Sequence, residues 1–260
     1  MSGRSLSLSS LSFGCLFLLW FGLTGFVFWK PLTDPLFLPS PFTVARTFVD
    51  LLVNGYQGRS LSFHVMMSLF RFGVALVVCI VVAIPLGLLM GMWETVKALV
   101  DPPIEIIRPI PKLALLPLLI IWFGIGEMAK ILVIVLAIFP IMSISAMQAV
   151  RSVSKRKVQA AYSLGASNRT VFCRVLLPAS LPGIFTGIRV SIGVGVTMLV
   201  GAEMIATSNG IAWMALAASD FLLSNVVLVA VGIMALMGFI LDQIARGIEN
   251  WFVHWSGKEG

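Results

Sequence analysis

Apolar runs about as long as a bilayer is thick constrain this chain more than any other feature. Residues 11–29 contain no charged side chain, and a helix needs about 20 mostly apolar residues to cross the hydrocarbon core. Backbone exposed to lipid must satisfy its own hydrogen bonds, so spans of this kind are helical. We therefore expect an all-α polytopic membrane protein, a single transmembrane domain over residues 1–260 with six spans at about 11–29, 72–93, 113–125, 131–150, 183–206 and 221–241.

The composition excludes the main alternative class, a water-soluble globule. The chain is 59% hydrophobic and only 11% charged, whereas soluble domains carry about 25% charged residues. A soluble fold of this size would lack the polar groups needed to cover its surface. A multi-pass membrane protein is the prediction, with the lipid bilayer as its surroundings and no nucleic acid as a partner.

The basic residues predict the orientation of the spans. If the N-terminus is cytoplasmic, the inner segments hold twelve Lys and Arg residues and the outer segments hold four. Short cytoplasmic loops carry an excess of basic residues, so both termini are expected inside. On the outer side, Phe42, Ala45, Phe48, Val49 and Leu52 share one helical face, which predicts a short amphipathic helix along the interface.

One predicted cytoplasmic loop, residues 151–182, holds most of the net charge. It has no acidic residue and contributes +6 of the net charge of +7. We expect a helix over about 154–164 that ends at Gly165 in the left-handed conformation. Ser167 is expected to cap a second helix, which Pro178 limits. An apolar face beside cations is typical of a docking surface, although a basic loop touching anionic lipid is the simpler alternative.

The residue pattern of this loop favours docking. It reads Gln159-Ala160-Ala161-x3-Gly165-x9-Val175-x-Leu177-Pro178, and it resembles the Glu-Ala-Ala loop of ATP-binding-cassette (ABC) importer permeases. Gln159 replaces the usual Glu, so a salt bridge from that position is not expected. The resemblance implies that the loop forms coupling helices seated on a cytoplasmic ATPase, with the contact made by Gln159, Ala160, Ala161, Leu164, Gly165, Ala166, Ser167, Phe172, Leu177 and Pro178.

Other segments resemble the nitrate/sulfonate/taurine branch of the same family. They include the Leu-Pro-Ser-Pro segment ending at Pro41, the stretch 108–131, and the segments 181–190 and 200–206. The resemblance covers about residues 30–255 and is greatest to taurine and aliphatic-sulfonate permeases. It implies a type I ABC importer permease fold in the bacterial cytoplasmic membrane. The implied partners are a second permease copy, two ATPase subunits and a periplasmic substrate-binding protein.

The ATP and Mg²⁺ are expected on the ATPase. The chain has no Gly-x4-Gly-Lys-Ser/Thr loop to hold nucleotide phosphates, and we expect no catalytic residue, cofactor or metal site on it. His64 and His254 are expected at surface or interface positions.

Ionisable residues inside spans are candidates for the translocation path. Arg189 and Glu203 both lie in the predicted span 183–206. Fourteen residues separate them, about 21 Å along a helix, so they cannot pair on one straight helix. We hypothesise that Arg189 attracts a small sulfonate anion, against the alternative that each residue pairs with a neighbouring helix. Trp122, Phe123 and Glu127 at the outer break form either a gate or a tight helical hairpin.

Three alternatives remain at this point. A permease of the same family could carry nitrate or a bicarbonate-like anion instead of taurine. A stand-alone secondary transporter would need several intramembrane carboxylates or repeated halves, and only Glu203 fits that requirement. A membrane enzyme would need a nucleophile and base or a cluster of His, Asp and Glu, which the sequence lacks.

Overall fold

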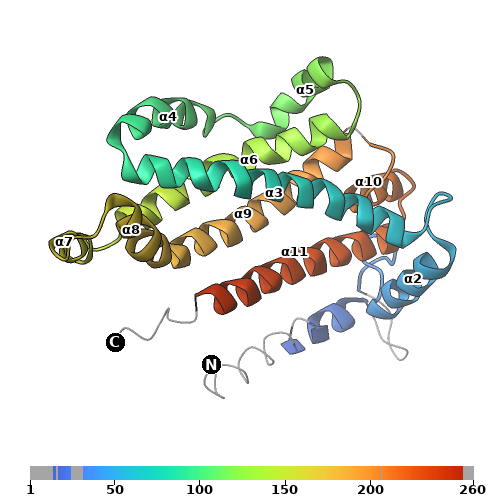
Figure 1. The fold of residues 1–260 in the computed structure, drawn as a ribbon. Coiled ribbons are helices and arrows are strands. Elements are labelled where there is room, and N and C mark those ends of the chain that lie inside the picture. Colours follow the sequence, from blue (N-terminus) through green and yellow to red (C-terminus); the bar gives the residue numbers. More distant parts are fainter. Residues whose placement is uncertain (1–13, 16, 25–31, 206, 254–260) are drawn as a thin grey trace. The chain divides into compact units, whose positions relative to one another are not determined.

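The computed structural model describes residues 14–15, 17–24, 32–205 and 207–253, and these residues are nearly all helical (Figure 1). Two short turns interrupt the helices: a 3₁₀ turn, η1 (Lys112–Leu115), and a π-helical turn, η2 (Phe172–Leu176). The helices are α2 (Pro41–Asn54), α3 (Leu61–Met92), α4 (Glu94–Ile107), α5 (Leu116–Phe123), α6 (Glu127–Arg151), α7 (Lys155–Ser163), α8 (Asn168–Val171), α9 (Leu177–Ile205), α10 (Ile211–Asp220) and α11 (Ser224–Phe252).

Within the described residues, four helical segments are long and apolar enough to cross a membrane: α3, α6, the continuous stretch Asn168–Ile205, and α11. A fifth crossing is possible if α4 and the segment Lys112–Phe123 together make one span, bent by 88°. Of the first expected span, 11–29, the structure describes residues 14–15 and 17–24, which are helical, and the rest lies outside the described residues. The six-span count and the positions of the termini therefore stay predictions.

Two helices extend beyond the uncharged runs from which their spans were predicted. Helix α3 begins at Leu61 rather than near residue 72, and α11 continues to Phe252 rather than ending near residue 241. The added segments carry Arg71 and Asp242, and each forms ion pairs within the chain. Pairing lowers the free energy of placing such groups in a span. Uncharged runs alone therefore underestimate the lengths of these two helices.

Within the expected third span, 113–125, the α-helix is shorter than the expected span. Helix α5 has eight residues, about 12 Å at 1.5 Å per residue, which is less than half of the hydrocarbon thickness. The segment expected to be a cytoplasmic loop before it contains α4, a helix of 14 residues with Pro102 and Pro103 inside it.

The chain forms two compact units, and α3 and α11 contribute residues to both. In the unit made of residues 1–66 and 209–234, Leu51 and Leu61 pack with Ile211 and Met214 of α10. Helix α2 forms as expected, but Leu51 is buried. The predicted apolar face is largely exposed at Phe42, Phe48, Val49 and Leu52, so the described chain leaves it uncovered.

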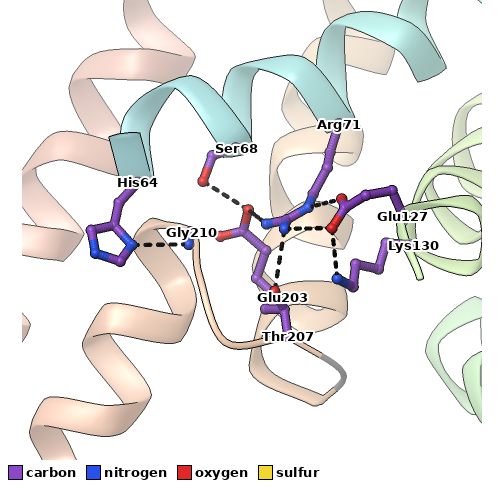
Figure 2. A network of polar contacts seen from close by, with 8 residues as sticks. All are labelled: His64, Ser68, Arg71, Glu127, Lys130, Glu203, Thr207 and Gly210. Carbon is purple, nitrogen blue, oxygen red and sulfur yellow. Dashed lines mark hydrogen bonds and ion pairs between the residues drawn. The ribbon is translucent and has the colours of Figure 1, made fainter. Parts of the chain in front are cut away.

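His64 is not at the surface, contrary to expectation. It is fully buried in the unit made of residues 1–66 and 209–234. Its ring stacks on Trp213 at 5.6 Å between centroids, and its Nδ1 accepts a hydrogen bond of 3.2 Å from Gly210 N (Figure 2). The stacking on Trp213 and the hydrogen bond from Gly210 give this side chain a structural role. His254 lies outside the described residues.

In the unit made of residues 67–208 and 235–260, α6 and α9 lie side by side at close range (Figure 1). A Cβ at Gly183 would lie 2.7 Å from the Cβ of Ala149, and a Cβ at Gly187 would overlap the side chain of Ser145. On α3, Gly91 faces Val150 of α6 in the same way. A Cβ at Gly87 of α3 would likewise lie 2.2 Å from Ser143 O of α6. The pairs Gly87-x3-Gly91 and Gly183-x3-Gly187 therefore pack helices within this chain, as expected for small residues at contacts in a membrane.

A buried group of polar side chains joins three helices of the same unit, and Arg71 of α3 lies at its centre (Figure 2). Its Nε and Nη2 donate to the two carboxylate oxygens of Glu127 at 2.5 and 3.0 Å. Its Nη1 donates to Glu203 Oε1 at 2.7 Å. The planar donor fork of arginine suits two carboxylates at once, so one side chain ties the first residue of α6 to the last turn of α9.

Neighbouring side chains complete this group. The Ser68 hydroxyl donates to Glu203 at 2.7 Å, the Lys130 ammonium donates to Glu127 at 2.9 Å, and Arg71 donates to the Thr207 hydroxyl at 3.2 Å (Figure 2). The Arg71 side chain is 0% exposed and that of Glu203 is 1% exposed. Two cations balance two carboxylates, which is the condition under which buried charges are tolerated.

This arrangement predicts a large stability effect at Arg71. Arg71→Met leaves the buried Glu203 without its cation, and we expect a loss of about 3–5 kcal/mol in the free energy of unfolding. Thermal unfolding of the purified protein in detergent measures it. The double variant Arg71→Met/Glu203→Met removes both charges and should recover most of the loss. A single variant as stable as wild type, or a double variant less stable than the single one, would contradict the account.

Candidate functional site

The loop between α6 and α9 begins with α7 and a tight turn. Helix α7 ends at Ser163, close to the predicted boundary. Gly165 adopts φ +77°, its N–H donates to Tyr162 O at 2.9 Å, and Ala166 N–H donates to Ala161 O at 3.1 Å. These two bonds form a Schellman motif, in which a left-handed glycine satisfies the last carbonyls of a helix. The predicted role of Gly165 in the turn is confirmed.

The second half of the loop differs from the prediction. Ser167 caps α8 as expected, because its Oγ accepts from Thr170 N at 3.3 Å. Helix α8 has only four residues and passes through the π-helical turn into α9, so Pro178 does not end the helix. Pro178 is the second residue of α9, directly after the turn where the hydrogen-bond register shifts. At that position the missing N–H of proline costs little stability, because the regular hydrogen-bond pattern of the α-helix is already interrupted there.

The expected coupling residues differ in exposure. Gln159, Ala160, Leu164, Gly165 and Ser167 are exposed, and Leu164 is 88% exposed. Ala161, Ala166, Phe172, Leu177 and Pro178 are half-buried. An apolar side chain that protrudes this far into water is typical of a contact surface.

The basic residues of the loop lie on both sides of this turn in the sequence. Arg151 forms an ion pair with Glu94 of α4, which fixes the beginning of the loop. Within the described chain, Lys155, Arg156, Arg169 and Arg174 have no acidic partner within ion-pair distance. The loop is therefore a cationic helix–turn–helix, with a hydrogen-bonded turn at Leu164 and Gly165.

The predicted path residues do not form one cluster. Glu127 and Glu203 come together on the Arg71 guanidinium (Figure 2). Trp122 and Phe123 end α5 with exposed rings. Gly124 caps α5 at φ +81°, and its N–H donates to Ile120 O at 2.8 Å. The break between α5 and α6 is thus a sharp turn, and a gating role for its aromatic residues stays a prediction.

Arg189 is separate from both groups and is paired. Its Nε donates to Asp242 Oδ1 of α11 at 3.0 Å, and its Nη1 lies 3.6 Å from Glu249 Oε2. Asp242 also accepts from Arg246 at 2.7 Å. Two carboxylates already balance the Arg189 charge, so pairing with a neighbouring helix is what the structure has. Attraction of a passing anion by Arg189 stays a prediction.

Sequence reasoning missed Arg71, the residue that organises the buried group. Arg71 lies one residue before the expected span 72–93 and received no role, although an arginine next to a span is itself a signal. The partners of Arg71 on α6 and α9 are 56 and 132 residues away. A sequence pattern within one helix carries no information about such a contact.

A family model now places the chain among transporters. Residues 83–254 match the family described as binding-protein-dependent transport system inner membrane component. The match includes α6, the loop with Gly165, α9 and all of α11, which are the elements that carry the site.

Individual relatives agree with that match. The chain is 42% identical over 228 residues to the taurine transport system permease protein of Escherichia coli, covering 87% of this chain and 83% of the relative. It is 32% identical over 221 residues to a permease protein of Bacillus subtilis named for aliphatic sulfonate transport, covering 85% and 79%.

Solved structures share the fold at lower identity. A methionine ABC transporter in an inward-facing conformation matches with a TM-score of 0.56 and 21% identity, covering 72% of this chain and 95% of that chain. An amino acid ABC transporter matches with a TM-score of 0.57 and 16% identity, covering 82% and 97%. The chain belongs to the family of binding-protein-dependent transport system inner membrane components and is a multi-pass, inner-membrane permease subunit of an ABC importer.

Proposed function

We propose that this chain is the transmembrane subunit of an ATP-driven importer that carries taurine or a related small sulfonate into the cytoplasm. Two copies form the pathway, two ATPase subunits bind the coupling loops, and a periplasmic protein delivers the substrate. ATP and Mg²⁺ bind to the ATPase, since this chain has no phosphate-binding loop of the Gly-x4-Gly-Lys-Ser/Thr type.

The observation that supports the docking role is the hydrogen-bonded turn at Leu164 and Gly165. The turn is fixed by two backbone hydrogen bonds and presents a side chain that is 88% exposed. A protruding apolar residue on a loop rich in basic residues fits a pocket that is apolar at its centre and acidic at its rim. The Gln159 side chain can donate and accept hydrogen bonds there, but it adds no charge.

Coupling follows from the connectivity of the loop. Its first residue ends α6 and its last turn continues into α9, so a displacement of the loop acts directly on both helices. Closure of two ATPase subunits around ATP would bring the two coupling loops together. Helices α6 and α9 of each copy would then move with their loop, which closes the pathway on one side of the membrane and opens it on the other.

The choice of substrate rests on the relatives. The taurine permease of Escherichia coli is 42% identical and the sulfonate-named protein of Bacillus subtilis is 32% identical. Taurine is an aminoalkanesulfonate, so both names point to a small molecule with a sulfonate group. Longer alkanesulfonates are the second candidate, favoured by the second relative.

The turn geometry gives a direct test of docking. Gly165→Val places a β-branched residue at φ +77°, which residues of this type rarely adopt. We expect the turn to change shape and ATP-driven uptake to fall about tenfold or more, since strain of 1–2 kcal/mol corresponds to roughly that factor. Uptake into proteoliposomes and co-purification of the ATPase measure the effect.

Gly165→Asn is the matched control, because asparagine tolerates the left-handed region and a side chain there meets open space. It should retain most of the ATPase binding and uptake. Normal uptake by Gly165→Val, in protein that is inserted normally, would overturn the docking role.

The substrate assignment has its own experiment. Proteoliposomes that contain the complex, supplied with the cognate periplasmic protein, should take up labelled taurine only when ATP is inside. Unlabelled alkanesulfonates should compete, and nitrate should not. Uptake of nitrate with no uptake of taurine would reject the sulfonate assignment and leave the importer assignment intact.

A further inference from the structure

A polar groove lies between α6 and α9, next to the coupling loop. It has a volume of about 300 Å³, and its polar lining comes from Ser145, Gln148 and Ser152 on the α6 side and Thr186 on α9. The remaining lining residues are Ala149, Gly183, Gly187 and Val190, so no charged side chain lines it.

The close approach of the two helices forms the floor of this groove. Gly183 faces Ala149, and Gly187 faces Ser145, at distances that leave no room for a Cβ. The helices cannot come closer, and the polar side chains stand at the edges of the contact. The groove is therefore a fixed feature of the α6–α9 pair.

Some of the hydrogen-bonding capacity of the groove is open to a ligand. Thr186 and Ser152 donate to backbone carbonyls of their own helices. Gln148 is exposed and Ser145 is half-buried, so the Gln148 amide and the Ser145 hydroxyl can be reached from the groove. One helical turn beyond Gly187, the hydroxyl of Ser191 is buried and has no partner within the part of the chain that the structure describes. A buried polar group without a partner is rare and calls for an explanation.

The chemistry of the lining selects a ligand class. Hydroxyl and amide groups both donate and accept hydrogen bonds, so they can serve a sulfonate and an ammonium group together. A simple anion would leave water here without meeting a cation, which is unfavourable. The nearest arginine in sequence to this part of α9, Arg189, is occupied by Asp242 and Glu249.

We propose that this groove is the part of the translocation path next to the coupling loop, and that it binds a small zwitterion of the aminoalkanesulfonate class in passing. The proposal rests on the importer function proposed above and adds to it the substrate-lining residues. It also assigns part of the substrate preference to the permease: Gln148 and Ser145 favour a zwitterion over an anion of similar size. Binding is weak, because only a few neutral hydrogen bonds form.

The first test compares two glutamine variants. Gln148→Leu removes the amide from the groove, and we expect taurine uptake at saturating loaded periplasmic protein to fall about three- to tenfold, the range for one or two hydrogen bonds. Gln243→Leu is the matched control, because Gln243 is an exposed residue of α11 outside the groove, and its uptake should not change. Equal uptake by wild type and Gln148→Leu would overturn the proposal.

The second test is independent of uptake and of the periplasmic protein. In a background with the exposed Cys15 and Cys173 replaced by serine, Gln148→Cys should react with a water-soluble thiol reagent in the assembled permease–ATPase complex. Millimolar taurine should slow that reaction, whereas 2-hydroxyethanesulfonate, which lacks the ammonium group, should slow it far less.

A reaction rate that taurine does not change would remove the groove from the path. Equal protection by both compounds would contradict the preference for a zwitterion. Neither result depends on whether wild-type complex imports taurine, so failure of this proposal is distinguishable from failure of the proposed function.

Discussion

The close contact between α6 and α9 is the constraint on which the rest of the structure depends. In a membrane, lipid tails are as apolar as the helices, so helices associate where small residues let their backbones approach. Gly183 and Gly187 provide that approach, and a side chain at either position would collide with α6. The coupling loop joins the same two helices at one end. In the proposed function, an ATPase movement that displaces this loop would therefore act on a pair of helices that is already packed together.

The buried ionic group secures the other end of this pair. Arg71 binds Glu127 at the start of α6 and Glu203 in the last turn of α9 (Figure 2). Such a group contributes less to net stability than a well-packed apolar cluster would, because its charges must be desolvated. It does specify which helix ends meet, since any other register leaves a buried charge unpaired. Glycine contacts along the pair and charges at its end thus act together to hold α3, α6 and α9.

Local chemistry was predictable from the sequence and distant pairing was not. The turn at Gly165 and the cap at Ser167 depend on hydrogen bonds that span five residues or fewer, so their residue types predicted them. The lengths of α3 and α11 were underestimated, because charged residues such as Asp242 are paired with residues on other helices. Pro178 was expected to end a helix, and the π-helical turn before it removed that effect. The groove at Gln148 required knowledge of which faces of α6 and α9 meet, which no single-helix pattern contains.

The central claim is that α6 and α9 move as one body when the ATPases act on the coupling loops. Spin labels on cysteines at Met128 and Met204 report on it directly, since these exposed residues lie in the first turn of α6 and the last turn of α9. A second label pair at Leu164 of the two copies reports the movement of the loops. The account predicts that ATP binding shortens the distance between the loops and leaves the 128–204 distance unchanged. A change in the 128–204 distance as large as that between the loops would contradict it.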